Sequence, residues 1–96
     1  MLTIHLTALA EKEIDEAEFW YEAQLPGLGK DFHDEVDQKI AHISANPAQY
    51  PAVRRGIRRA VLKRFPFSVL FRVSEDTVFV VGCFHAKRNP TRWRGR

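Results

Sequence analysis

The fold of this chain is decided by residues 67–93, which read FSVLFRVSEDTVFVVGCFHAKRNPTRW. Phe67–Val73 and Thr77–His85 are rich in β-branched and aromatic residues, a composition that favours strands. The three residues between them, Ser74–Asp76, are typical of a turn. This stretch therefore predicts a β-hairpin, followed by a basic tail.

A two-residue loop at Glu75 and Asp76 would give this hairpin two unlike faces, because side chains alternate across a strand. In that register Val73 lies opposite Val78, Phe71 opposite Val80, and Phe67 opposite Phe84. One face is wholly apolar and needs a cover of helices; it carries Phe67, Val69, Phe71, Val73, Val78, Val80, Gly82 and Phe84. The other face is mixed and is interpreted as the wall of a groove; it carries Ser68, Leu70, Arg72, Phe79, Val81, Cys83 and His85.

The first half of the chain has the pattern of two helices, which can cover the apolar face of the hairpin. Leu2–Leu6 alternates apolar and polar residues as a half-buried strand does, and Thr7 is a plausible N-cap. Apolar residues spaced three and four apart predict one helix from Ala8 to about Gln24 and another from about Gly29 to Ala45. Pro26-Gly27 and Asn46-Pro47 end the two helices. We expect Gly82 to let a helix approach the sheet closely.

The rest of the chain completes the predicted topology. Ala48–Val53 is interpreted as a connector and Ile57–Lys63 as a strand. The order β-α-α-β-β-β predicts an α+β fold, with a helical hairpin packed on one face of a small, mainly antiparallel sheet. Because the chain has 96 residues, we expect a single domain over residues 1–96, with a basic tail over residues 86–96.

Composition indicates a cytoplasmic protein. No apolar run approaches the roughly 20 residues that a membrane span needs, and the N-terminus lacks a signal-peptide pattern. The single cysteine, Cys83, excludes an internal disulfide and suits a reducing compartment. Cys83 and His85 alone are too few ligands for a metal site, so no metal is expected.

Charge is distributed unevenly along the chain, although the net charge is only +3. Residues 1–46 hold three Lys/Arg and ten Asp/Glu, a net charge of −7, and residues 47–96 hold twelve Lys/Arg and two Asp/Glu, a net charge of +10. One interpretation is that the helices carry Glu and the strands carry Arg only to keep the protein soluble. The other is an acidic helical back and a basic sheet front that faces an acidic partner, either nucleic acid or a negatively charged protein segment.

A few side chains allow more than one role. Trp20 lies at the edge of the apolar stripe of the first helix. Phe19 lies nearly opposite that stripe, among the acidic residues, either exposed by chance or in contact with a partner chain. His85 is either a structural histidine at a strand end or a base at neutral pH. In the assumed register Arg72 and His85 lie at opposite ends of the hairpin, roughly 20 Å apart, so we do not expect them to share one catalytic centre. The tail is either a solvated end or packs through Trp93.

The element order, the hairpin FSVLFRV…DTVFVVGCFH and the following HAKRNPTRW resemble the RelE/ParE superfamily of bacterial toxins from type II toxin–antitoxin systems. The resemblance covers essentially the whole chain and is most specific at His85 and residues 87–90, KRNP. It implies a toxin that is neutralised by a cognate antitoxin whose C-terminal segment wraps it, in a toxin–antitoxin hetero-oligomer. It implies no cofactor and no membrane partner.

The resemblance implies one of two activities, since RelE-like members cleave messenger RNA on the ribosome and ParE-like members inhibit DNA gyrase. The metal-free cleavage needs basic side chains that converge on one phosphate. Arg59 falls at a lysine position of the ribonuclease pattern, and Arg88 matches its arginine after the last strand. Val61 and Ser68 fall at two further basic positions, and neither residue holds charge. These departures favour the ParE-like branch and gyrase as the target.

The alternative is a ribosome-dependent ribonuclease that uses Arg59, His85 and Arg88. His85 lies one residue before the histidine that some ribonucleases of the family use, and ParE-like members also have a histidine near this position. A third alternative is a nontoxic nucleic-acid-binding module of the same fold. For the ParE-like interpretation no catalytic residue is assigned, and the residues expected to bind the target or the antitoxin are Arg58, Arg59, Lys63, Arg64, Arg72, Lys87, Arg88 and Trp93.

Overall fold

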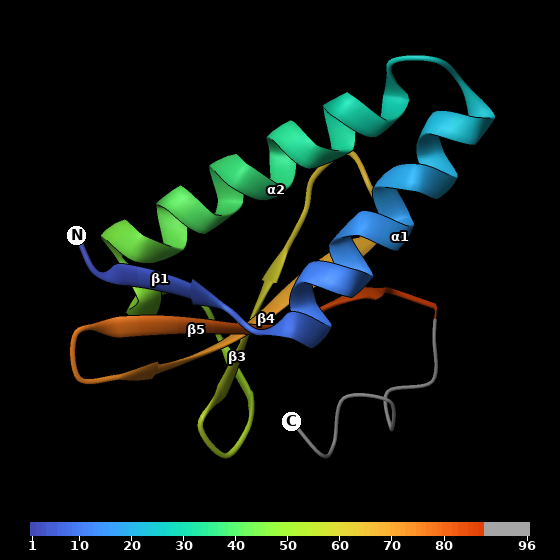
Figure 1. Cartoon of the computed structure of the whole chain (residues 1–96). Helices are drawn as coiled ribbons and strands as arrows, with labels where there is room; N and C mark the ends of the chain where they lie inside the picture. Colours follow the sequence, from blue (N-terminus) through green and yellow to red (C-terminus); the bar gives the residue numbers. More distant parts are fainter. Residues whose placement is uncertain (88–96) are drawn as a thin grey trace.

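Two helices cover one face of a five-stranded sheet in the computed structural model, which describes residues 1–87 (Figure 1). The elements in chain order are β1 (Thr3–Leu6), α1 (Ala8–Gln24), α2 (Leu28–Ala45), the 3₁₀ helix η1 (Pro47–Gln49), β2 (Ala52–Arg54), β3 (Ile57–Val61), β4 (Phe67–Ser74) and β5 (Thr77–His85). The strand order is β1-β5-β4-β3-β2, with β1 parallel to β5 and every other pair antiparallel. The predicted α+β fold is confirmed. Neither helix in this part of the chain is long and apolar enough to cross a membrane.

Side-chain hydrogen bonds cap the N-terminus of each helix in the helical hairpin. Thr7 is the N-cap of α1, as predicted, and its Oγ1 accepts a hydrogen bond from the Ala10 N–H at 3.1 Å. The N-cap of α2 is Gly27, which has no side chain to serve that purpose. Glu22 of α1 supplies the missing acceptor, since its carboxylate takes hydrogen bonds from the N–H groups of Gly27 and Gly29. A carboxylate is well placed there because the N-terminus of a helix carries partial positive charge.

Close packing of the two helices depends on Gly29. A Cβ added at this position would lie 2.7 Å from the Glu18 carbonyl oxygen and 2.9 Å from Glu22 Cβ, so only glycine fits without a shift. The sequence assigned a similar role to Gly82, and that prediction was wrong. Gly82 pairs with Leu70, whose side chain belongs to a cluster on the other face of the sheet.

The main core lies between the helices and the sheet. Its aromatic centre is formed by Tyr21 and Phe32 of the helices with Phe65 and Phe67, whose ring centroids are 4.8–6.0 Å apart. The other fully or partly buried members of this cluster include Ala10, Ile14, Val36, Ile43, Ala60, Val69, Phe71, Val78, Val80 and Cys83. Burial of this many apolar side chains is the principal stabilising term for a domain of this size.

A β-bulge changes the register of the hairpin in its second half. The predicted pairs Val73–Val78 and Phe71–Val80 are confirmed, but the register then shifts, and Phe67 lies opposite His85 rather than Phe84. The shift occurs because β5 has one residue more than β4 between the two paired regions. A shift of one residue turns the following side chains to the other face. Cys83 therefore joins the core beneath the helices, and Phe84 leaves it.

The short strand β2 corrects a second prediction. Ala52–Arg54 was interpreted as part of a connector, but it pairs with β3 across a turn that contains Gly56, whose φ is 73°. Three residues are too few to show the alternation that marks a strand in sequence. The predicted strand Ile57–Lys63 is also shorter than expected and ends at Val61.

Candidate functional site

The basic residues of the second half do not form one surface, because alternation along β3 sends neighbours to opposite faces. Arg59 lies opposite Leu70 on the face of the sheet without helices, which we call the helix-free face. Arg58 lies opposite Phe71 on the helix side, where its Nη1 donates to the Tyr50 carbonyl oxygen at 2.5 Å. Of this adjacent pair, only Arg59 stands on the helix-free face.

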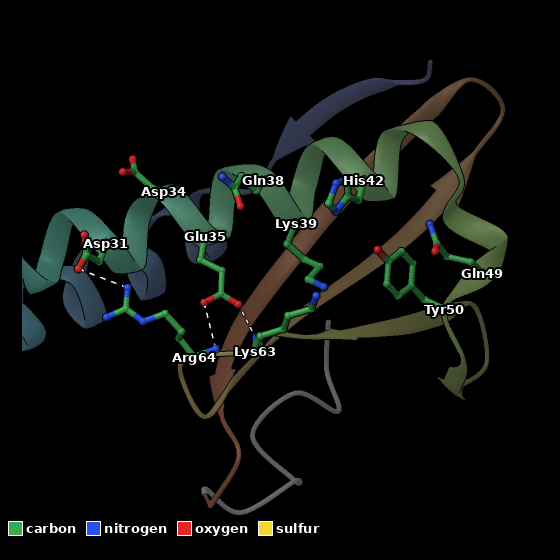
Figure 2. A pocket seen from close by; sticks show the side chains of 10 residues that line it. All are labelled: Asp31, Asp34, Glu35, Gln38, Lys39, His42, Gln49, Tyr50, Lys63 and Arg64. Atoms are coloured by element: carbon green, nitrogen blue, oxygen red, sulfur yellow. Dashed lines mark hydrogen bonds and ion pairs between the residues drawn. The ribbon is translucent and has the colours of Figure 1, made fainter.

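Lys63 and Arg64 line a pocket of about 560 Å³ between α2 and the loop after β3 (Figure 2). Their backbone N–H groups both donate to the Glu35 carboxylate, and the Arg64 bond is 3.1 Å long. Arg64 Nη1 also lies 3.4 Å from Asp31 Oδ2. Lys39 stands over the Tyr50 ring in the same pocket. Asp31 therefore matches the charge of Arg64, and Glu35 holds the backbone of the loop that carries Lys63 and Arg64.

A row of planar side chains crosses the helix-free face at the other end of the hairpin. Arg72 lies opposite Phe79, and its guanidinium carbon is 4.6 Å from the Phe79 ring centroid. His5 of β1 meets the same ring edge-on at 5.4 Å. Arg72 and His5 are exposed. This end of the helix-free face therefore presents a cation supported by an aromatic ring, a combination suited to contact with an acidic partner.

A small second core lies on the helix-free face. It consists of Ile57, Leu70, Val81 and Phe84, with Val53 and Phe79 packed against it. Beside this cluster, Val61 and Ser68 lie directly opposite each other, and Val61 is 54% exposed. The two positions at which the resemblance expects basic side chains are thus cross-strand neighbours, and together they form an uncharged site next to Arg59.

His85 lies on the helix side of the sheet. It stands opposite Phe67, and the two ring centroids are 5.2 Å apart. Its Nδ1 accepts a hydrogen bond from the Lys87 N–H at 3.0 Å. Arg72 and His85 lie at opposite ends of the hairpin, as predicted, and also on opposite faces. The structure therefore places Arg59 and His85 on different sides of the sheet.

A groove that the sequence did not reveal runs between α1 and the second half of β5. It has a volume of about 850 Å³, and its lining includes Leu9, Glu13, Trp20, Tyr21, Cys83 and His85. The Glu13 carboxylate accepts a hydrogen bond from the Cys83 backbone N–H at 3.0 Å. Trp20 is 57% exposed at this groove, and Phe19 is 79% exposed next to it in the chain. The spacing of Leu9, Glu13, Glu16 and Trp20 along α1 was the available sequence signal.

The surroundings of Cys83 make its thiol unreactive. Its side chain is buried, and burial followed by the nearby Glu13 charge raises the pKa of its thiol to about 12. A thiol with such a pKa is a poor nucleophile and a poor metal ligand near neutral pH. Two further predicted binding residues, Arg88 and Trp93, lie outside the described residues.

Comparisons with known proteins agree with this architecture. Residues 4–90 match the model of the family described as ParE toxin of type II toxin-antitoxin system, parDE. None of the curated proteins matches the sequence significantly.

Solved structures provide the same fold at low sequence identity. The chromosomal ParDE toxin–antitoxin system of P. aeruginosa matches with a TM-score of 0.80 at 20% identity, covering 91% of this chain and 98% of that one. The isolated E. coli RelE toxin matches with a TM-score of 0.69 at 14% identity, covering 99% and 95%. The RelBE2 toxin–antitoxin complex of Mycobacterium tuberculosis matches with a TM-score of 0.62 at 19% identity, covering 88% and 96%.

The family match spans nearly the whole chain, and the structural match to the ParDE system has a higher TM-score than the match to RelE. The family match favours the ParE-like branch of the RelE/ParE superfamily, and the structural matches show the shared fold. This chain belongs to the family of ParE toxins of type II toxin–antitoxin systems.

Proposed function

We propose that this toxin inhibits DNA gyrase by binding to it and is neutralised by its cognate antitoxin. The observation that carries the proposal is the separation of Arg59 and His85 by the sheet, together with the uncharged pair Val61 and Ser68. A protein that acts by binding needs a complementary surface and no convergent catalytic groups.

The chemistry of RNA cleavage supports the same conclusion. Metal-free cleavage needs a base for the attacking hydroxyl and cations around one phosphate. Arg59 cannot accept the proton, since the pKa of arginine exceeds about 12. The Nδ1 atom of His85 accepts a hydrogen bond from the Lys87 N–H. In the neutral ring the proton is then on Nε2, so Nε2 has no lone pair with which to accept a proton from the attacking hydroxyl. The alternative site of Arg59, His85 and Arg88 would therefore require a rearranged hairpin.

The proposed gyrase contact is the helix-free face around Arg59 and Arg72. Exposed cations such as Arg72 steer an acidic partner and set the association rate. The other proposed binding residues are Arg58, Lys63, Arg64, Lys87, Arg88 and Trp93. Because Arg64 pairs with Asp31 and Arg58 donates to Tyr50, we expect these two to contribute less than Arg72.

The test is inhibition of gyrase supercoiling of relaxed plasmid by charge-reversed variants. Arg72→Glu is expected to raise the half-inhibitory toxin concentration by about tenfold, the change that loss of a well-placed interface charge produces. Lys30→Glu is the matched control, because it makes the same charge change at an exposed position on the helical side. Equal inhibition by both variants would contradict this assignment of the contact face.

A further inference from the structure

The hairpin of β2 and β3 ends the sheet on the side opposite β1, with β2 as the outer strand. Its strands are joined at Arg55 and Gly56, and Gly56 has a φ of 73°. A Cβ added at Gly56 would meet nothing within 4 Å, so this side of the turn is open to solvent. Figure 1 shows the turn extending from the sheet on the side away from both helices. The tip of the β2–β3 hairpin is therefore accessible to a partner.

This hairpin lies in a stretch of the chain that carries positive charge alone. Residues 47–74 contain seven Lys/Arg and no Asp or Glu, and four of the seven are arginines within residues 52–61. Two of these arginines, Arg54 and Arg55, are exposed beside the turn. The tip thus presents two neighbouring cations in a segment without a carboxylate of its own.

The other two arginines of the hairpin face elsewhere. Arg58 donates to the Tyr50 carbonyl oxygen on the helix side of the sheet. Arg59 stands opposite Leu70 on the helix-free face, which is the proposed gyrase contact. The two arginines at the tip therefore belong to neither of these contacts.

The charge and the shape of the tip both fit duplex DNA. The duplex carries one phosphate charge for about every 1.7 Å of its axis. Arginine binds phosphate through planar pairs of N–H donors. A two-stranded β-ribbon can also enter the major groove, which is about 12 Å wide. A narrow hairpin with arginines at its turn can therefore reach phosphates on the rim of a groove.

An acidic protein fits the tip less well. Protein interfaces are centred on large side chains, often aromatic, that fill a pocket on the partner. In the described part of the chain, the exposed large apolar residues are Met1, Leu9, Phe19, Trp20, Leu25, Val61 and Val73. None of these described residues lies within residues 52–57, around the turn. The tip therefore offers charge without an apolar anchor, which favours a nucleic acid.

We propose that the tip of the β2–β3 hairpin binds phosphates of duplex DNA through Arg54 and Arg55. The inference rests on the proposed inhibition of gyrase and adds a second contact to it. Gyrase holds the DNA that it supercoils, so a toxin on its surface can contact the enzyme and the DNA together. The helix-free face contacts the enzyme, and the hairpin tip contacts the DNA. Two contacts strengthen the complex, because the second forms within an assembly that the first has already made.

The first experiment measures binding of the full-length toxin to a short DNA duplex of mixed sequence at several salt concentrations. In the double variant Arg54→Gln with Arg55→Gln, we expect the affinity at low salt to fall at least about fivefold. The plot of log affinity against log salt should become less steep by about 2, because two phosphate contacts are lost. No binding of duplex DNA by the wild type would overturn the inference.

The matched control is Lys12→Gln with Lys30→Gln. It makes the same change in net charge at two exposed positions, one on α1 and one on α2. We expect it to keep the salt dependence of the wild type, because these lysines lie on the helices and not at the hairpin tip. An equal loss of DNA affinity in the two double variants would show a general effect of net charge and would overturn the assignment to the hairpin.

Two further variants separate charge from folding. Arg55→Gln alone changes one exposed turn residue and should make the salt dependence less steep by about 1. Arg54→Lys with Arg55→Lys keeps both charges and should keep the steepness of the wild type, since the salt dependence counts phosphates neutralised. A lysine variant as shallow as the glutamine variant, with an unchanged midpoint in urea denaturation, would contradict a contact made by charge.

The second experiment compares toxin binding to gyrase with and without bound DNA. The glutamine double variant should bind DNA-free gyrase within about twofold of the wild type, and the gyrase–DNA complex at least about fivefold more weakly. Equal weakening in both would show that the tip contacts protein and would overturn the assignment to DNA, as would no weakening in either. Binding of duplex DNA by a toxin that does not bind gyrase would instead refute the proposed function and leave the DNA contact of the hairpin standing.

RNA is the alternative ligand with the same phosphate chemistry. Unlabelled single-stranded RNA should displace the labelled DNA duplex less effectively than unlabelled duplex does, because a single strand releases fewer counterions for each phosphate neutralised. RNA that competes better than duplex DNA would overturn the assignment to DNA.

Discussion

Phe67 and His85 face each other across β4 and β5, with ring centroids 5.2 Å apart and planes inclined at 80°. This contact exists because β5 holds one residue more than β4 at the bulge, which turns Cys83 and His85 toward α1. Arg59 meanwhile stands on the helix-free face, opposite Leu70. The bulge thus separates the histidine from the arginine that a ribonuclease interpretation would combine.

The neighbouring thiol offers a simple check of the bulged register. Cys83 is buried beneath α1 with its pKa raised to about 12, so at pH 8 it is almost wholly protonated. We expect it to resist a thiol reagent such as DTNB in the native protein and to react completely after denaturation. Rapid stoichiometric reaction in native buffer would contradict the placement of Cys83 in the core.

The close crossing of α1 and α2 at Gly29 predicts that one added methyl group there lowers the stability of the fold. Gly29→Ala would place its Cβ 2.7 Å from the Glu18 carbonyl oxygen, so α1 and α2 must move apart. We expect a loss of about 1–3 kcal/mol in the free energy of unfolding, measured by urea denaturation. Lys30→Ala, at the next position and exposed, is the control and should leave the free energy of unfolding nearly unchanged. Similar losses for both variants would argue against a tight crossing.

The His33 cluster predicts a pH dependence of stability. His33 Nδ1 lies 2.7 Å from Glu18 Oε1, and Nε2 lies 3.3 Å from Asp37 Oδ2. The hydrogen bond to Glu18 is the main cause that raises the pKa of His33 above its ordinary value of 6.5. Burial opposes this rise in the pKa, and the nearby charges of Asp37, Glu18 and Asp34 add to it. The stabilisation is therefore complete below about pH 6.5 and is lost as the pH rises through the raised pKa.

The measurement is the difference in unfolding free energy between wild type and His33→Gln over a range of pH. The difference should shrink from pH 6 to pH 9 by less than about 1 kcal/mol, because these side chains are roughly half exposed and solvent screens the pair. His42→Gln controls for removal of another histidine from α2. A difference that stays constant with pH would show that the His33 contacts contribute nothing in solution.

The loop after β3 depends on one helix carboxylate. Glu35 accepts hydrogen bonds from the backbone N–H groups of both Lys63 and Arg64 (Figure 2). Glu35→Ala leaves two donors without this acceptor and should cost about 1–2 kcal/mol in the free energy of unfolding. The control is Asp34→Ala, one residue earlier. Within residues 1–87 Asp34 forms an ion pair with the exposed Lys30, so its loss should cost less than about 0.5 kcal/mol in the free energy of unfolding. A reversed order of the two losses in urea denaturation would contradict this role of Glu35.

The sequence predicted the helices almost to the residue, because α1 and α2 repeat apolar residues at helical spacing between clear stop signals. It predicted the start of the hairpin correctly, since Glu75 and Asp76 are turn residues, and Glu75 has a φ of 56°. It did not predict the bulge. The extra residue of a bulge is of the same type as the strand residues around it, so alternation alone cannot reveal where the bulge lies.

The candidate site was harder to predict for a related reason. Charge counted along the chain indicated one basic front, but alternation and pairing divide it: Arg59 and Arg72 stand on the helix-free face, while Arg64 pairs with Asp31. The groove under α1 depends on Glu13 and Cys83, which are 70 positions apart and show no shared pattern in sequence. Such long-range contacts are set by the fold as a whole.

The measurement that tests the central claim most directly is a pair of assays on purified toxin freed from antitoxin. One follows gyrase supercoiling of relaxed plasmid, and the other follows cleavage of messenger RNA on programmed ribosomes. The account predicts loss of supercoiling with intact messenger RNA. Cut messenger RNA with normal supercoiling would contradict it and would make Arg59, His85 and Arg88 the residues of a working ribonuclease site.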